Sequence, residues 1–351
     1  MKNSVVKIDN SNYRKVCSLL EKEPRKWLIT GVAGFIGSNL LEKLLLLGQY
    51  VVGLDNFCTG KRENLLQVEQ IVGKQRWKNF KFYEGDLREL DVCASVCSDV
   101  DVVLHQGAIG SVPRSIEFPA DSHGANATGT LNIFIAAKEK NVKRVVYASS
   151  SAVYGDEPSL PKVESRIGKP LSPYAATKLF NEIYADLFSK LYGIELIGLR
   201  YFNVFGPRQD PEGPYAAVIP KWISSMLKNQ PVFIYGDGET SRDFCYVANV
   251  VQANILAATT DRQEALNRVY NIAVGQRTTL NQLYFCLKER LQTTTPGLKI
   301  GEPIYKEFRP GDVRHSLADI SLAQTFLGYQ PTHSLQDGLD DALEWYKRNL
   351  T

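Results

Sequence analysis

A tyrosine and a lysine four residues apart, Tyr174 and Lys178, are the side chains of this 351-residue sequence best spaced to move a proton. Pro173 introduces the helix that we predict over 174–191, so both side chains lie on one helix face. A phenol has a pKa of about 10 and is a weak base at neutral pH, but a neighbouring ammonium favours the phenolate. With 17 tyrosines, about one such pair is expected by chance, so only its position in the fold can show whether the pair is functional.

Three serines, Ser149 to Ser151, end the strand that we predict over 143–149. They precede the tyrosine helix at the distance needed to bring strand tip and helix together. We predict that Ser150 hydrogen-bonds the reacting oxygen and that Ser151 assists. A plain turn at the strand end explains Ser149 equally well.

A glycine turn organises the first part of the chain. Gly31, Gly34 and Gly37 follow a short apolar strand and open a leucine-rich helix that runs to Leu47. Gly31 suits the tight turn, Gly34 lets a phosphate oxygen approach the backbone, and Gly37 lets the helix pack close to the sheet. The helix N-terminus then offers N–H groups to a pyrophosphate. Glycines near a turn can be plain packing, but this context favours a dinucleotide site.

The second strand, over 50–54, ends in Asp55, about 20 residues past the glycines. An acid at that place binds the ribose hydroxyl pair and favours NAD over NADP. Lys61 and Arg62 lie close by and weaken this preference. A bound nicotinamide ring is cationic, which is a second reason for Tyr174 to ionise.

Strands and helices alternate from Lys26 onward, which predicts an α/β fold, a doubly wound parallel sheet with a smaller mixed α/β lobe. We expect an N-terminal extension over 1–25, with a helix over 12–23 on the outside of the fold. We expect a dinucleotide-binding domain over 26–204, to which 245–273 returns, and a substrate lobe from 205–244 and 274–351. Ligands of such sheets lie beyond the carboxyl ends of the strands. The polar residues just after predicted strands are Asp86, His105, Gln106, Ser149, Ser150, Ser151 and Asn203.

Bulk properties exclude several function classes. The chain is 44% hydrophobic with a formal charge of +3, which gives no reason to expect nucleic acid or an anionic membrane as partner. The sequence shows no secretory signal and no apolar run long enough to span a bilayer. Six scattered cysteines, without a His or Cys set that completes a zinc site, fit free thiols in a reducing compartment. We therefore expect a cytoplasmic protein without a metal.

Taken together, the motifs resemble the extended short-chain dehydrogenase/reductase family. Within it the chain is similar to UDP-hexose 4-epimerases, above all to the bacterial enzymes that interconvert UDP-N-acetylglucosamine and UDP-N-acetylgalactosamine, or their uronic acids, for surface polysaccharides. Gly107 departs from the alanine usual in that subgroup. The resemblance runs from about Trp27 to the C-terminus and rests on the glycine turn, Asp55–Phe57, Gly85–Arg88, Leu104–Gln106, Gly110–Ser115, Ser149–Gly155, Tyr174 with Lys178, Arg200–Pro207, Arg242–Phe244 and Gly311–Ser316.

The resemblance implies a mechanism and a set of contacts. Tyr174 takes the proton of the sugar 4-hydroxyl while C4 passes hydride to NAD; the 4-keto sugar then turns over, hydride returns to its other face, and NAD stays bound. The implied catalytic residues are Tyr174, Lys178, Ser150 and Ser151. The implied NAD contacts are Gly31, Gly34, Phe35, Ile36, Gly37, Asp55, Asn56, Gly60, Asp86, Leu87, Gln106, Ala108, Tyr174 and Lys178. The implied contacts to the UDP-sugar are Ser111, Arg114, Ser150, Asn203, Gln209, Ala217, Val218, Tyr235, Arg242, Arg309, Asp312 and Ser316.

The size of the side chains in the substrate site is expected to decide which sugar is accepted. The related glucose-type enzymes carry a bulky residue where this chain has Ser316, so the resemblance implies space for a 2-acetamido group. Ala217 fits the same interpretation. We expect N-acetylated substrates to be preferred, and the uronic forms stay open because Arg114 or His315 can meet a carboxylate.

Two other functions compete with epimerisation. A nucleotide-sugar 4,6-dehydratase shares the fold and the first hydride step, but dehydratases carry an Asp-Glu pair where this chain has Ser151 and Ala152. A non-catalytic NAD-binding protein of this fold would be expected to lose Tyr174 or Lys178.

Family members commonly pair two helices per subunit, so we also expect a homodimer through a four-helix interface built from 126–140 and 174–191.

Overall fold

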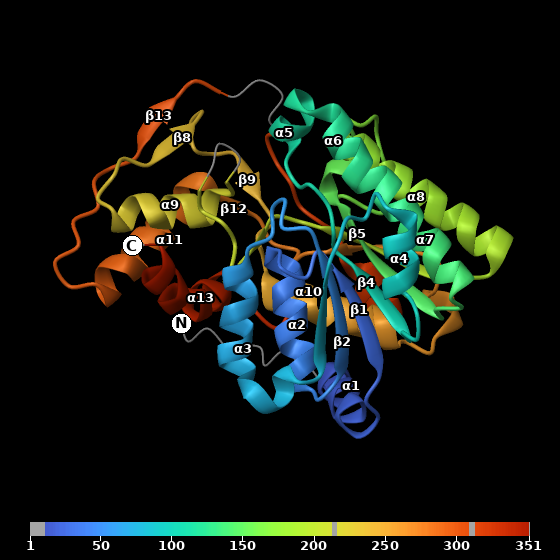
Figure 1. The fold of residues 1–351 in the computed structure, drawn as a ribbon. Coiled ribbons are helices and arrows are strands. Elements are labelled where there is room, and N and C mark those ends of the chain that lie inside the picture. Colours follow the sequence, from blue (N-terminus) through green and yellow to red (C-terminus); the bar gives the residue numbers. More distant parts are fainter. Residues whose placement is uncertain (1–10, 213–215, 309–312, 351) are drawn as a thin grey trace.

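A seven-stranded parallel sheet forms the centre of the computed structural model, which describes residues 11–212, 216–308 and 313–350 (Figure 1). Its strand order is β11-β6-β5-β4-β1-β2-β3, and every pairing in it is parallel. The strands are β1 (Lys26–Thr30), β2 (Tyr50–Asp55), β3 (Phe80–Glu84), β4 (Val102–His105), β5 (Arg144–Ser150), β6 (Glu195–Tyr201) and β11 (Val269–Ile272). This architecture confirms the predicted α/β fold with a doubly wound parallel sheet.

Helices cover both faces of the sheet because its strands alternate between two apolar cores. In β1, Trp27 and Ile29 pack into one core and Leu28 into the other. The first core lies under α2 (Phe35–Leu46), α10 (Val247–Thr259), α3 (Arg62–Trp77) and α12 (Ser321–Leu327); the second lies under α4 (Leu90–Val96), α7 (Gly129–Glu139) and α8 (Pro173–Tyr192). Because the inner strands are buried on both faces, they fix the position of the loops at their ends.

A third apolar cluster belongs to the other side of the molecule, seen at the left of Figure 1. It is built around α9 (Val218–Leu227), α11 (Leu280–Thr294) and α13 (Leu335–Asn349), with three two-stranded pairs beside it. The pairs are β7 (Val204–Phe205) with β10 (Cys245–Tyr246), β9 (Ser241–Arg242) with β12 (Thr278–Thr279), and β8 (Phe233–Tyr235) with β13 (Ile304–Lys306). The exact division of the chain into two lobes stays a prediction.

Several element bounds differ from those expected. The helix predicted over 126–140 is wrong at its start, because the helical run begins at Pro119 and consists of α6 (Pro119–His123), a π-helical turn (Gly124–Thr128) and then α7. A short α5 (Val112–Glu117) and a 3₁₀ turn (Ser151–Tyr154) also interrupt loops that sequence alone left open. The N-terminal helix α1 (Ser11–Lys22) lies on the outside of the fold against α10, with Leu20 buried. Among the described residues, no helix is long and apolar enough to cross a membrane.

Candidate active site

The glycine turn is packed so closely that side chains have no room there. Gly31 has a φ of +67°, and a Cβ on it would lie 2.8 Å from the backbone of Gly107. A Cβ on Gly37 would lie 2.1 Å from the carbonyl oxygen of Gly31. Helix α2 therefore starts directly against the turn, and its first N–H groups face the cleft above the sheet.

A cleft runs over this turn along the carboxyl ends of the strands; we call it the glycine cleft. The cleft fits NAD, because the backbone at the glycine turn is bare and α2 presents its N-terminus there. The predicted NAD contacts that line it are Gly31, Gly34, Phe35, Ile36, Gly37, Asp55, Asn56, Asp86, Leu87, Gln106, Ala108, Tyr174 and Lys178. Gly60 does not line it and lies instead against Asp55, where a Cβ would be 2.9 Å from both carboxylate oxygens.

Two carboxylates of the glycine cleft are held in place by neighbouring donors. Asp55 accepts the backbone N–H of Ala33 at 2.9 Å and of Phe57 at 2.8 Å, and burial raises its pKa. Asp86 accepts a hydrogen bond from the Arg88 guanidinium at 2.6 Å and one from the Asn56 amide at 2.8 Å. The hydrogen bond from Arg88 lowers the pKa of Asp86 to about 2. The two acids thus stand at neighbouring strand ends, β2 and β3, with their orientations fixed.

The predicted proton-transfer group lies at the other end of the same cleft. The hydroxyl of Ser150 lies within reach of the Tyr174 hydroxyl and lowers its pKa, and the Nζ of Lys178 donates to the Ala148 carbonyl at 2.8 Å. Lys178 Nζ lies 6.0 Å from the centre of the Tyr174 ring. The predicted lowering of the Tyr174 pKa by Lys178 is not found in the protein alone: burial raises this pKa, and the nearby Ser150 hydroxyl offsets the rise in part.

A second helix fixes where Tyr174 stands. Ser172 caps α8 by accepting the N–H of Ala175, and the N–H of Tyr174 donates to Ser115 of α5 at 3.0 Å. Since α5 also carries the loop of Ser111, the start of α8 and this loop are tied together. Sequence reasoning missed Ser115, because its partner lies 59 residues away.

Gln106 joins a polar triangle under the glycine cleft. Its amide nitrogen donates to Asn254, its oxygen accepts the Tyr201 hydroxyl, and Asn254 donates to Tyr201, all at 2.9 to 3.0 Å. His105, expected among the site residues, turns into the core instead, between Thr30 at 2.7 Å and Thr130 at 2.9 Å. Burial lowers the pKa of His105 to about 3, so it stays neutral and structural.

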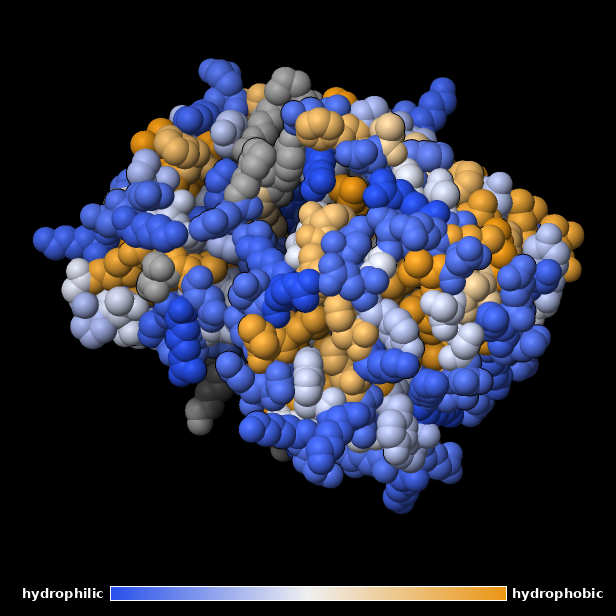
Figure 2. All heavy atoms as spheres, viewed as in Figure 1, coloured by the Kyte–Doolittle hydropathy of each residue, from blue (hydrophilic) through white to orange (hydrophobic). Residues whose placement is uncertain are grey.

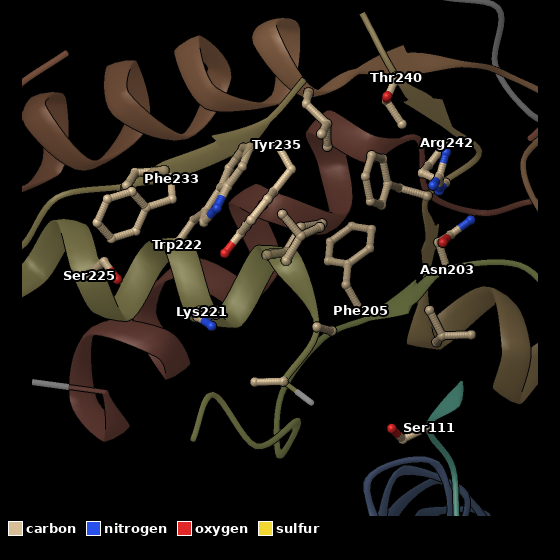
Figure 3. Close-up of a pocket in the computed structure, with 18 of the residues that line it drawn as sticks. Ser111, Asn203, Phe205, Lys221, Trp222, Ser225, Phe233, Tyr235, Thr240 and Arg242 are labelled. Carbon is tan, nitrogen blue, oxygen red and sulfur yellow. The ribbon is translucent and has the colours of Figure 1, made fainter. Parts of the chain in front are cut away.

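A second hollow, the aromatic pocket, opens beside the first and has a volume of about 400 Å³. In Figure 3 the rings of Trp222, Phe233 and Tyr235 lie on one side of it, Asn203 and Arg242 lie on the other, and Ser111 enters from a separate segment. Among the predicted substrate contacts, it is lined by Ser111, Asn203, Ala217, Val218, Tyr235 and Arg242. Sequence reasoning did not single out Phe205, Trp222, Phe233 or Thr240.

A third hollow, the serine pocket, lies between the start of α8, the 3₁₀ turn after β5 and the segment that carries Ser316. Ser151 and Ser316 line it, and Asn203 and Arg242 line both this pocket and the aromatic pocket. Asn203 has a φ of +32° and Ser111 a φ of +131°, so two lining residues have strained backbones, as is common at binding sites.

Four predicted substrate contacts are placed otherwise or lie outside the described residues. Arg114 lines none of the three hollows, and its backbone N–H donates to the side chain of Ser111, which caps α5. Gln209 is turned toward its own loop, with its amide donating to the Val204 carbonyl at 2.9 Å. Arg309 and Asp312 fall outside the residues that the structure describes.

Comparisons with known proteins agree with this geometry. The family model for the NAD dependent epimerase/dehydratase family matches residues 27–273. A putative UDP-glucose 4-epimerase of Methanocaldococcus jannaschii is 38% identical over 92% of this chain and 98% of its own.

Two solved structures have the same fold. The UDP-glucose 4-epimerase of Thermotoga maritima, solved with UDP-glucose, is 37% identical with a TM-score of 0.83, over 93% of this chain and 100% of its own. The UDP-N-acetylglucosamine 4-epimerase of Methanobrevibacter ruminantium, solved with UDP-N-acetylmuramic acid, is 39% identical with a TM-score of 0.82, over 93% and 97%. The chain belongs to the NAD-dependent epimerase/dehydratase family of extended short-chain dehydrogenases/reductases, and its cofactor is NAD.

Proposed function

We propose that this protein is a 4-epimerase that interconverts UDP-N-acetylglucosamine and UDP-N-acetylgalactosamine through a transient 4-keto sugar. The observation that carries the proposal is the meeting of Tyr174, Ser150 and Lys178 at the end of the glycine cleft, next to both pockets. Bound NAD supplies the hydride acceptor and donor. The chain itself must move one proton, hold the sugar carbon near the cleft and let the sugar ring turn over.

Tyr174 is the proton-transfer group in this proposal. Its hydroxyl lies near that of Ser150, so both hydroxyls can hydrogen-bond the 4-oxygen of the sugar. Lys178 is fully enclosed, and burial lowers the pKa of its amine to about 8, so it is an ammonium at neutral pH. A positive charge there favours the phenolate once the sugar hydroxyl offers its proton.

The aromatic pocket suits the uridine diphosphate. Its rings give stacking surface to a base, and the guanidinium of Arg242 suits the charge of a diphosphate. The sugar then reaches toward Tyr174 past Asn203, which lines both pockets. By family analogy Arg309 and Asp312 would complete the diphosphate contacts.

The serine pocket supports N-acetylated sugars. Ser316 is small and leaves the pocket open on the side of the sugar, and Ala217 is small on the side of the aromatic pocket. A 2-acetamido group therefore has room that a bulky residue at 316 would take away. The uronic acids remain candidates for the same site.

Helix α8 supports the expected homodimer. Ile183, Leu187 and Leu191 recur every four residues and are 52%, 43% and 69% exposed, and Tyr192 continues the stripe. Figure 2 shows hydrophobic residues gathered at the right-hand edge of the molecule, where α8 ends. A second copy that packs the same stripe against this one would bury both.

Proton NMR of the purified protein with UDP-N-acetylglucosamine, without added cofactor, tests the proposed function. An epimerase produces UDP-N-acetylgalactosamine until the two sugars reach a constant ratio, and Tyr174→Phe loses this activity. A 4-keto-6-deoxy product would identify a dehydratase instead. Faster turnover of UDP-glucose than of UDP-N-acetylglucosamine would refute the substrate assignment.

A further inference from the structure

Three side chains of α8 face the last three residues of β5, one turn of helix apart. The Tyr174 hydroxyl lies within reach of the Ser150 hydroxyl, and Lys178 donates to the carbonyl of Ala148 at 2.8 Å. One turn further on, Glu182 accepts the hydroxyl of Ser149 at 2.5 Å. We call these three contacts the α8–β5 row. Because the row includes both side chains of the proton-transfer pair, its third member bears on their position.

Glu182 is itself held by a buried ion pair. Arg200 of β6 donates to it through Nε at 2.9 Å and Nη2 at 2.7 Å, and the two side chains are only 4% and 8% exposed. Arg200 is the register neighbour of Ser149 across the β5–β6 pair. The carboxylate therefore ties together α8, β5 and β6 at the strand ends beside the active site.

We propose that Glu182 is a positioning residue that holds the end of β5 against α8 and keeps Lys178 charged. The inference rests on the proposed function, since it concerns the same Tyr174 and Lys178. The Glu182–Ser149 hydrogen bond fixes the end of β5. The residues on either side of Ser149, Ala148 and Ser150, are the ones that face Lys178 and Tyr174. The carboxylate is also the anion one turn from the ammonium of Lys178.

The charges around Lys178 give the direction of the effect. Burial lowers the pKa of Lys178 to about 8, and Glu182 opposes this shift. The other titratable or charged groups near the row are Tyr174 on α8, His105 on β4, Tyr147 on β5 and Arg200 on β6. Burial keeps His105 and Tyr147 uncharged at neutral pH, and Arg200 is a cation. Loss of the Glu182 charge therefore lowers the pKa of Lys178 further.

The test is the pH profile of kcat for the NAD-loaded enzyme and its Glu182→Gln variant. Turnover that needs the Lys178 ammonium falls as pH rises through the pKa of Lys178. We expect this alkaline limb to move to lower pH by about one unit or more in Glu182→Gln. If that variant does not fold, the double variant E182Q/R200Q, which does not leave the Arg200 guanidinium buried without its partner, is expected to move the limb in the same direction by a smaller amount.

Glu195→Gln is the matched control. Glu195 pairs with Arg144 at 2.6 Å across the same two strands, at their opposite end and away from Tyr174. Its loss is expected to lower stability without moving the pH profile. An unchanged alkaline limb in the Glu182 variants, or an equal shift in Glu195→Gln, would overturn the inference. Absence of turnover by the wild-type protein would overturn the proposed function and the inference with it.

Discussion

Replacement of Gly37 by alanine tests the glycine turn most severely. The new Cβ would lie 2.1 Å from the Gly31 carbonyl oxygen, 2.8 Å from its carbonyl carbon and 2.9 Å from the Cα of Val32. All three are backbone atoms, so neither side can rotate away. The start of α2 must then move from the turn by about 1 Å or more before the contact becomes ordinary.

Both stability and NAD binding should suffer. Forced packing of this kind costs about 1–3 kcal/mol of unfolding free energy. The N–H groups at the start of α2 move with the helix and weaken their hydrogen bonds to the diphosphate, each of which contributes about 1.5–3 kcal/mol, or up to about 10²-fold in affinity. We therefore expect Gly37→Ala to lower the melting temperature and to weaken NAD binding about 10²-fold.

The assay measures NAD content after gel filtration together with thermal unfolding. Gly48→Ala is the control: Gly48 has a φ of +72°, but a Cβ there meets nothing within 4 Å. It adds backbone strain without displacing α2, so it should lose stability yet retain NAD. A Gly37→Ala protein that binds NAD as tightly as the wild type would refute the close-packing argument.

Three further predictions concern stability, specificity and assembly. Burial raises the pKa of Asp243 from 3.8 to about 6, so its proton binds the folded chain more tightly than the unfolded one. The contribution of Asp243 to the free energy of unfolding is therefore fully present below about pH 4 and declines by about 3 kcal/mol as pH rises through about 6. The difference in urea stability between wild type and Asp243→Asn, measured across this pH range, should show the decline. A difference that does not vary with pH would contradict it. Ser316→Tyr fills the serine pocket, so kcat/KM for UDP-N-acetylglucosamine should fall at least about 10-fold more than that for UDP-glucose, and an equal loss for both would count against the volume argument. Leu187→Glu puts a charge into the exposed stripe of α8 and should convert a dimer into monomers by light scattering, whereas Leu66→Glu on α3, 56% exposed at a site away from the stripe, should not.

Local patterns explain what the sequence predicted well. The glycine turn, the strand before it and Asp55 are set by neighbours within about 25 residues, so their spacing alone reveals the dinucleotide cleft. Alternation of buried strands and helices was enough to predict the parallel sheet.

Long-range contacts explain what the sequence did not predict. Gln106 and Asn254 are 148 residues apart and meet only because α10 packs against β4 and β5 in the folded chain. His105 follows the pattern of a site residue at a strand end, yet two threonines draw it into the core. The sequence alone did not predict a role for Glu182, because that role depends on its contacts with Arg200 and Ser149, which form only in the folded chain.

Deuterium labelling tests the central claim most directly, namely that C4 of a UDP-sugar gives up and regains its own hydrogen at the site of Tyr174. Purified protein is supplied with UDP-N-acetylglucosamine deuterated at C4, in ordinary water and without added cofactor, and the product is analysed by NMR and mass spectrometry. We expect UDP-N-acetylgalactosamine that keeps its deuterium at C4, and we expect Tyr174→Phe to lose the conversion. Loss of the deuterium to solvent, or its appearance at C6 of a deoxy sugar, would contradict it.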